Sequence, residues 1–190
     1  PINDFPLIPE YAALDPELTV GLPKFVTATT GLDALTHAVE AYIGRSTTKE
    51  TRVLCEEAVG LIYDNIREAV NNGTNRDARR NMLRASFCAG AAFTRSYVGY
   101  VHGIAHSLGG QYGTAHGLAN AVILPFFLRE YGDVIVRKLS KLSRLSVVRD
   151  DPNRDSISDK EAAERFITWV ESLNAEFGVP TYIEAIREED

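Results

Sequence analysis

The stretch TTGLDALTHAVEAYI, residues 29–43, carries the clearest helical pattern in the chain. Apolar residues recur in it every three to four positions, which places them on one face of an α-helix. They are Leu32, Leu35, Val39 and Ile43. Gly44 follows and is expected to end the helix. The same helix would carry Asp33 and His37 one turn apart, so this stretch predicts both a buried helix and a polar pair on it.

Similar helical patterns cover most of the remaining chain. They run over residues 47–70, 76–110, 118–132, 134–148 and 159–178. A capping box, Thr47 with Glu50, predicts the start of the first of these helices. A second capping box, Ser158 with Glu161, predicts the start of the last helix, and Gly178 predicts its end. Alternation of strands and helices is absent from the pattern, so we predict an all-α, multi-helical domain preceded by a short, proline-rich extended segment.

Charge and hydropathy argue against two classes of partner. The 190 residues have a formal net charge of -6, and Lys and Arg are spread among Asp and Glu without forming a basic stripe, so we expect no nucleic-acid partner. No apolar run approaches the length needed to cross a bilayer, so we expect no membrane partner. Cys55 and Cys88 are far apart and form no CxxC motif, as expected of small buried residues in a reducing cytoplasm.

Three of the four histidines lie in GYVHGIAHSLGGQYGTAHGLANAVILP, residues 99–125: His102, His106 and His116. His102 and His106 repeat the four-residue spacing of Asp33 and His37. Carboxylates and imidazoles spaced in this way on helices are typical ligands of a divalent metal. The glycines at positions 109, 110, 113 and 117 would permit a tight or left-handed backbone. We therefore predict that the chain turns there and brings His116 back towards His102.

Each of these residues also has a simpler interpretation. Asp33 could be a first-turn charge, paired with Thr30 as a cap. His37 could be a hydrogen-bonded core histidine, and His116 could end a turn. Taken together these interpretations require two matched spacings to arise by accident, and buried imidazoles cost free energy unless they are hydrogen-bonded or bind a metal. The combined pattern therefore favours a metal site.

The segments GLDALTHAVEAYI and GYVHGIAHSLGGQYGTAHGLANAVILP resemble the two signatures of the iron-containing (group III) alcohol dehydrogenases. That family belongs to a superfamily with glycerol dehydrogenase and dehydroquinate synthase. The resemblance extends from about Pro9 to the last helix. It implies that residues 1–22 are the end of a nucleotide-binding domain and a linker, and that residues 23–190 are the helical metal-binding catalytic domain. We expect that domain to be truncated at its C-terminus.

The resemblance also implies roles for individual residues. Asp33, His37, His102 and His116 match the metal ligands of the family. His106 matches a histidine that is not a ligand and lies by the nicotinamide and the substrate, where it is a plausible catalytic proton relay. Ala115 departs from the family pattern, which commonly has Pro there.

The donor set suits Fe(2+) or Zn(2+). The resemblance implies the activity of a metal-dependent alcohol dehydrogenase that interconverts a primary or small alcohol and its aldehyde or ketone. NAD(P) would be bound mainly by the missing N-terminal domain, so the chain alone would supply half an active site. The resemblance further implies a homo-oligomer for the full-length protein.

Three alternative functions stay open on the residues alone. A lyase resembling dehydroquinate synthase needs several basic residues around a phosphate, but only Arg95 closely precedes the histidine motif. A helical metal-dependent phosphohydrolase often uses a His-Asp dipeptide, which the sequence lacks, as it lacks HExxH. The third alternative is a metal-stabilised helical module without catalysis, which activity towards an alcohol with NAD would separate from the enzyme.

Overall fold

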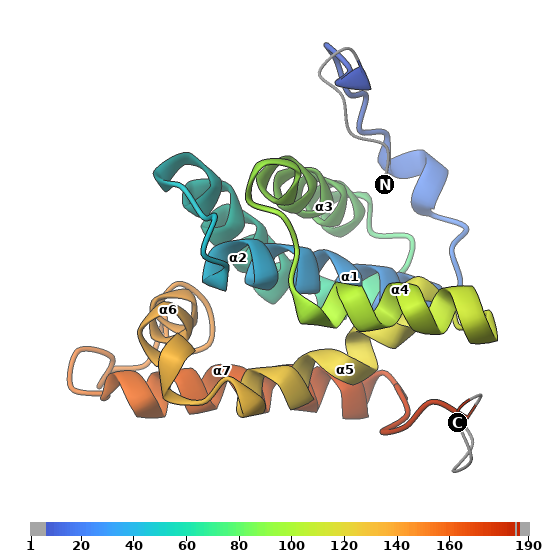
Figure 1. Cartoon of the computed structure of the whole chain (residues 1–190). Coiled ribbons are helices and arrows are strands. Elements are labelled where there is room, and N and C mark those ends of the chain that lie inside the picture. The colour runs from blue at the N-terminus through green and yellow to red at the C-terminus, as the bar shows by residue number, and fades with distance from the viewer. Residues whose placement is uncertain (1–6, 185, 187–190) are drawn as a thin grey trace.

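The computed structural model describes residues 7–184 and 186, and no strand occurs in that part of the chain. A 3-10 helix, η2 (Pro16–Thr19), precedes a set of α-helices (Figure 1). The α-helices are α1 (Lys24–Ile43), α2 (Lys49–Asn71), α3 (Arg76–Ser96), α4 (Tyr100–Tyr112), α5 (His116–Glu130), α6 (Asp133–Arg144) and α7 (Asp159–Glu176). The prediction of an all-α, multi-helical domain is confirmed.

Helix α1 lies in the middle of the molecule and organises the core. It packs against α2 and α3 on one side and against α5 and α6 on the other (Figure 1). Of the predicted apolar face, Leu32, Leu35 and Val39 are 0% exposed and Ile43 is partly buried against the core. A helix buried on several sides holds its polar residues in a fixed place, which makes α1 the frame of the site described below.

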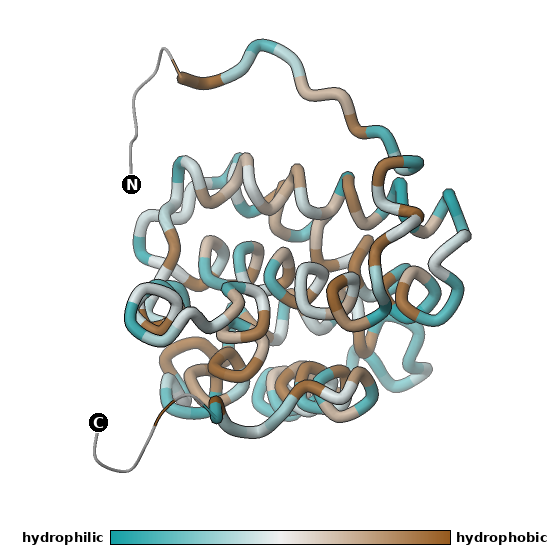
Figure 2. Tube along the Cα trace, turned by 90° about the vertical axis from the view of Figure 1, so that its right-hand side faces the viewer, coloured by the Kyte–Doolittle hydropathy of each residue, from teal (hydrophilic) through white to brown (hydrophobic). Residues whose placement is uncertain are grey.

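The chain before α1 runs outside the helical body (Figure 2). Its apolar residues Leu7, Tyr11 and Leu18 are exposed. Residues 11–15 are irregular, as expected of the predicted extended segment, and α1 begins at Lys24. The division of the chain into residues 1–22 and 23–190 stays a prediction. The start of the first part, residues 1–6, and the end of the second, residues 187–190, lie outside the described residues.

The expected single helix over residues 76–110 is wrong. The structure divides it into α3 and α4, with a turn at residues 97–99. Tyr97 in this turn has φ 63°, the one positive φ of a non-glycine residue in the described part of the chain. Helical periodicity continues across the turn, so the hydrophobic pattern could not reveal the break.

The capping signals are partly confirmed. Helix α7 begins as predicted, because Ser158 Oγ accepts a hydrogen bond from the Glu161 N–H at 3.1 Å, and Gly178 with φ 70° follows its end. The predicted box of Thr47 with Glu50 is wrong by one residue. Thr48 is the N-cap of α2, and its partner is Thr51, whose hydroxyl accepts from the Thr48 N–H at 2.9 Å. Two adjacent threonines offered the same local signal.

Two further expectations concern buried cysteines and membrane spans. Cys55 on α2 and Cys88 on α3 are free and buried, as predicted. Burial raises the pKa of both thiols, which keeps them protonated at neutral pH. Among the helices of the described residues, none is both long and apolar enough to cross a membrane.

Candidate metal centre

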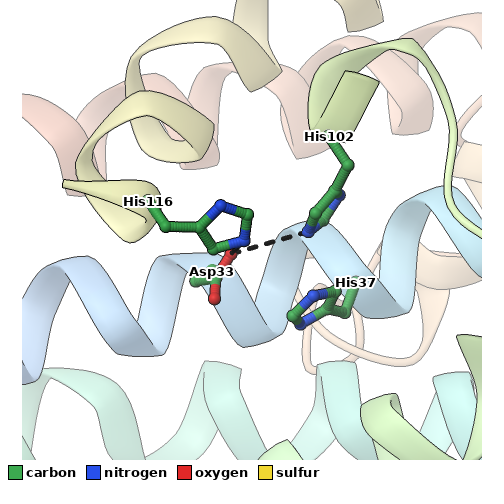
Figure 3. A group of neighbouring side chains, drawn as sticks. All are labelled: Asp33, His37, His102 and His116. Atoms are coloured by element: carbon green, nitrogen blue, oxygen red, sulfur yellow. Dashed lines mark ion pairs between the residues drawn. The ribbon is translucent and has the colours of Figure 1, made fainter. Parts of the chain in front are cut away.

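Three helices bring the four predicted ligands to one point (Figure 3). Helix α1 supplies Asp33 and His37, α4 supplies His102, and His116 is the first residue of α5. One ligand atom from each side chain can be chosen so that all four atoms lie within 4.8 Å of one another. Asp33 lies well inside α1, so its interpretation as a cap or first-turn charge is wrong.

The glycines position His116 differently from the prediction. Only Gly113, the C-cap of α4, is left-handed, with φ 67°. Gly109 and Gly110 lie inside α4, and Gly117 lies inside α5, so the expectation of a glycine-bent loop over all four positions is wrong. Gly117 instead allows close packing: a Cβ there would lie 2.7 Å from the Thr29 carbonyl oxygen of α1. That close approach sets His116 over Asp33.

The candidate ligand atoms face one another but do not form good hydrogen bonds with one another. Asp33 Oδ1 lies 3.6 Å from His102 Nε2 and 3.5 Å from His116 Nε2, both too long for good hydrogen bonds. His102 Nε2 is buried and has no hydrogen-bond partner among the described residues. The His37 ring stacks between Phe93 and His102, with centroids 4.4 and 4.3 Å away. Packing therefore holds the side chains in place, with their candidate ligand atoms directed towards the centre of the cluster.

Burial and mutual proximity shift the pKa values of the cluster. Burial alone would raise the pKa of Asp33, but His102, His37 and Asn120 outweigh it, so that pKa lies below its ordinary value. Burial lowers the pKa of His37 to about 4, which leaves this imidazole neutral at pH 7. Burial also opposes charge on His102, yet Asp33 and Glu40 outweigh it and raise its pKa. The ionised carboxylate of Asp33 and the neutral imidazole of His37 are thus both in the protonation state that binds a metal ion.

Two polar residues of the site were missed in the sequence. Asn120 is 0% exposed; its Nδ2 donates to Asp33 Oδ1 at 2.5 Å and lies 3.0 Å from His116 Nε2. The signal was an amide four positions after His116 in an otherwise apolar helix. Glu40 is 3% exposed and accepts from His102 Nδ1 at 2.7 Å. Its signal was a carboxylate three positions after His37, between apolar residues.

His106 lies beside the cluster and outside the group of four. Its ring centroid is 5.1 Å from that of His116 and 6.0 Å from that of His102. Its side chain is exposed, unlike that of His102. The limited burial of its ring, followed by the nearby His116 and His102, lowers the pKa of His106, which favours the neutral imidazole that can accept a proton.

The residues fit a divalent ion of borderline softness. Three imidazoles and one carboxylate without thiolates are ligands that Fe(2+) and Zn(2+) accept. The orphaned Nε2 of His102 is a buried acceptor that a cation would satisfy. His116 is the most open member, with 41% of its side chain exposed, so the cluster is reached from this side.

The fold and this cluster define a class of protein: a helical domain with a candidate divalent-metal site at its centre. The chain belongs to the Fe-containing alcohol dehydrogenase family, whose C-terminal family model matches residues 27–190. The recognition of that family in the sequence is confirmed.

Relatives of known function or structure agree with this assignment. The chain is 42% identical to the 1,3-propanediol dehydrogenase of Citrobacter freundii, over 93% of this chain and 44% of the relative. It is 36% identical to the NAD-dependent methanol dehydrogenase of Bacillus methanolicus, over 100% of this chain and 49% of that relative. The solved structure of a 1,3-propanediol oxidoreductase superposes with a TM-score of 0.86 at 40% identity, over 93% of this chain and 46% of that one. The chain thus spans about half the length of these relatives.

Proposed function

We propose that this chain is the metal-binding part of an NAD(P)-dependent alcohol dehydrogenase that interconverts a primary or small alcohol and its aldehyde or ketone. The observation that carries the proposal is the convergence of Asp33, His37, His102 and His116 within 4.8 Å in a member of this family. Fe(2+) is the proposed metal, with Zn(2+) as the alternative. The proposal also includes a cytoplasmic location and a homo-oligomeric whole protein. Residues 1–22 would be the end of an N-terminal nucleotide-binding domain and its linker, and residues 23–190 the helical catalytic domain.

The names of the relatives support an alcohol or aldehyde as the substrate. They act on propanediol and methanol, and one of them is named for NAD. A lyase of the dehydroquinate synthase type finds no support among them. A metal-stabilised module without catalysis is also less favoured, because the relatives are oxidoreductases.

Once bound, the metal would supply Lewis-acid polarisation of the substrate oxygen. The four side chains named above would hold it, and His37 is suited to this because burial keeps it neutral. His106 would act on the substrate side of the cluster. One of its ring nitrogens would accept the hydroxyl proton during alcohol oxidation, while hydride leaves for the nicotinamide, and would return the proton during aldehyde reduction.

The test is metal-dependent turnover of the full-length protein. The protein would be stripped with a chelator and reconstituted anaerobically with Fe(2+) or Zn(2+), and reduction of NAD+ or NADP+ by primary alcohols would be followed at 340 nm. We expect no activity in the stripped protein and recovery with one ion per chain. Turnover that does not depend on added metal would contradict the proposal.

A further inference from the structure

We propose that Glu40 is a positioning residue that holds His102 in the tautomer and orientation needed to bind the metal. The inference rests on the proposed function, since it concerns the same site. Glu40 lies on α1, seven positions after Asp33, and is nearly completely buried. A buried carboxylate is unfavourable unless it is well hydrogen-bonded, so its contacts indicate why the fold keeps it.

Glu40 directs both of its oxygens at the start of α4. Its Oε2 accepts from His102 Nδ1 at 2.7 Å and from the His102 backbone N–H at 3.3 Å. Its Oε1 accepts from the Val101 backbone N–H at 2.9 Å. The side chains of Glu40 and His102 are only 1% and 2% exposed, so water does not compete for these bonds. One carboxylate thus fixes both the backbone and the ring of His102.

The two backbone bonds make Glu40 the cap of a helix to which it does not belong. The N-cap of α4 is Gly99, which has no side chain to accept the N–H groups of the first turn. Glu40 takes over that task from α1, and its negative charge also suits the positive end of the α4 dipole. Gly99 makes room for it, because a Cβ there would lie 2.6 Å from Glu40 Oε1.

The ring bond selects the tautomer of His102. Glu40 Oε2 accepts from the His102 backbone N–H as well as contacting the ring at 2.7 Å, so this oxygen is an acceptor and Nδ1 carries the proton between them. In the neutral ring the lone pair then resides on Nε2, which is buried, without a partner among the described residues, and 3.6 Å from Asp33 Oδ1. Metal-bound histidines generally donate their second nitrogen to a carboxylate or carbonyl in this way.

Helix α1 therefore places a carboxylate beside each of the two ring nitrogens of His102. Asp33 faces Nε2 and Glu40 faces Nδ1, and the Cα positions of the two residues are about 10 Å apart along the axis of α1 at ~1.5 Å per residue. Glu40 does not itself belong to the group of four converging ligand atoms. We expect it to raise the metal affinity of the site by about 10–100-fold, the usual contribution of a residue that hydrogen-bonds to a metal ligand.

The experiment compares Glu40→Gln with Glu56→Gln in the full-length protein. Glutamine keeps the size of the side chain and one acceptor oxygen but loses the charge. Glu56 is the matched control, because it accepts from Tyr42 Oη at 2.8 Å and, within the described part of the chain, forms no hydrogen bond to a histidine. Titration of the metal-free variants with Zn(2+) would give the dissociation constants, and ¹⁵N-histidine NMR of the metal-free wild-type protein would report the tautomer of His102.

We expect about 10–100-fold weaker Zn(2+) binding in Glu40→Gln, unchanged binding in Glu56→Gln, and a proton on Nδ1 of His102 in the wild type. A Glu40→Gln variant that binds Zn(2+) like the wild type, while His102→Ala loses it, would overturn the role of Glu40 and leave the metal site standing. A wild-type protein that binds no Zn(2+) or Fe(2+) would overturn both. If Glu40→Gln does not fold, the wild-type spectrum recorded at a pH where the His102 ring is neutral decides, since a neutral ring with its proton on Nε2 refutes the proposal.

Discussion

Gly117 of α5 lies against the backbone of Thr29 of α1, so closely that a Cβ at position 117 would come within 2.7 Å of the Thr29 carbonyl oxygen. The obstacle is backbone, which cannot rotate away as a side chain does. His116 precedes Gly117 directly, so the separation of α1 and α5 at this point decides how far His116 lies from Asp33. Close helix packing and the geometry of the candidate metal site are thus the same feature.

Gly117→Ala is expected to push α5 away from α1 and to reduce the free energy of unfolding by about 1–3 kcal/mol, the usual effect of overpacking. Metal affinity should fall with it, because His116 moves. Gly110→Ala is the control, since no atom of the described residues lies within 4 Å of a Cβ at that position and alanine favours a helix. Urea denaturation and metal titration of both variants check this. Equal stability of the two would contradict the close contact.

His102→Ala and His116→Ala are each expected to remove most of the bound metal. Each change deletes one of four converging donors, and the remaining three lose the geometry that made them selective for the ion. The metal content of the purified full-length variants, measured by plasma mass spectrometry after reconstitution, is the readout. Wild-type stoichiometry in both variants would show that the ion binds elsewhere.

His106→Ala is expected to keep its metal and lose turnover. The His106 ring lies beside His116, but His106 is not among the four converging residues. The loss should be about 10²-fold in kcat if proton transfer is its task. His37→Ala should lose metal and activity together. If His106→Ala is as depleted of metal as His37→Ala, then His106 is a ligand.

Tyr97→Gly is expected to stabilise the turn between α3 and α4 by about 1 kcal/mol. Tyr97 combines φ 63° with ψ 176°, a region that only glycine adopts without strain, and its side chain is 63% exposed, so little packing is lost. Phe87→Gly serves as the contrast, because Phe87 is an exposed aromatic residue in the middle of α3, where glycine lowers stability by about 0.5–1 kcal/mol. Thermal unfolding of both variants should shift in opposite directions; a lowered midpoint for Tyr97→Gly would refute the strain.

Much of the site follows from local periodicity. The apolar residues that recur every three to four positions along α1 determine which side of the helix faces the core. Asp33 and His37 lie four positions apart, so they share one face of α1 whatever surrounds it. The family resemblance, rather than periodicity, implied that His102 and His116 join this pair, and the structure brings the four side chains together. The start of α7 at Ser158 followed equally well, because a cap is satisfied within three residues of its own position.

What the local pattern could not supply depends on partners distant in sequence. The break between α3 and α4 is one example, since α4 begins where Glu40, sixty-one positions before Val101, accepts its first N–H groups. Asn120 is another, because its amide acquires a role only when α5 lies against Asp33. Which of the glycines matters was likewise decided by the neighbour of Gly117 rather than by its own dihedral angles.

The sequence by itself determined the helices and the residue types of the cluster, because helix formation and amphipathic spacing are set by neighbours three to four positions apart. Only the tertiary structure decided which carboxylate faces which nitrogen of His102, with Asp33 at Nε2 and Glu40 at Nδ1. That choice depends on the distance and angle at which α4 packs on α1. Helix packing is set by the contacts of many side chains at once, which no short stretch of sequence contains.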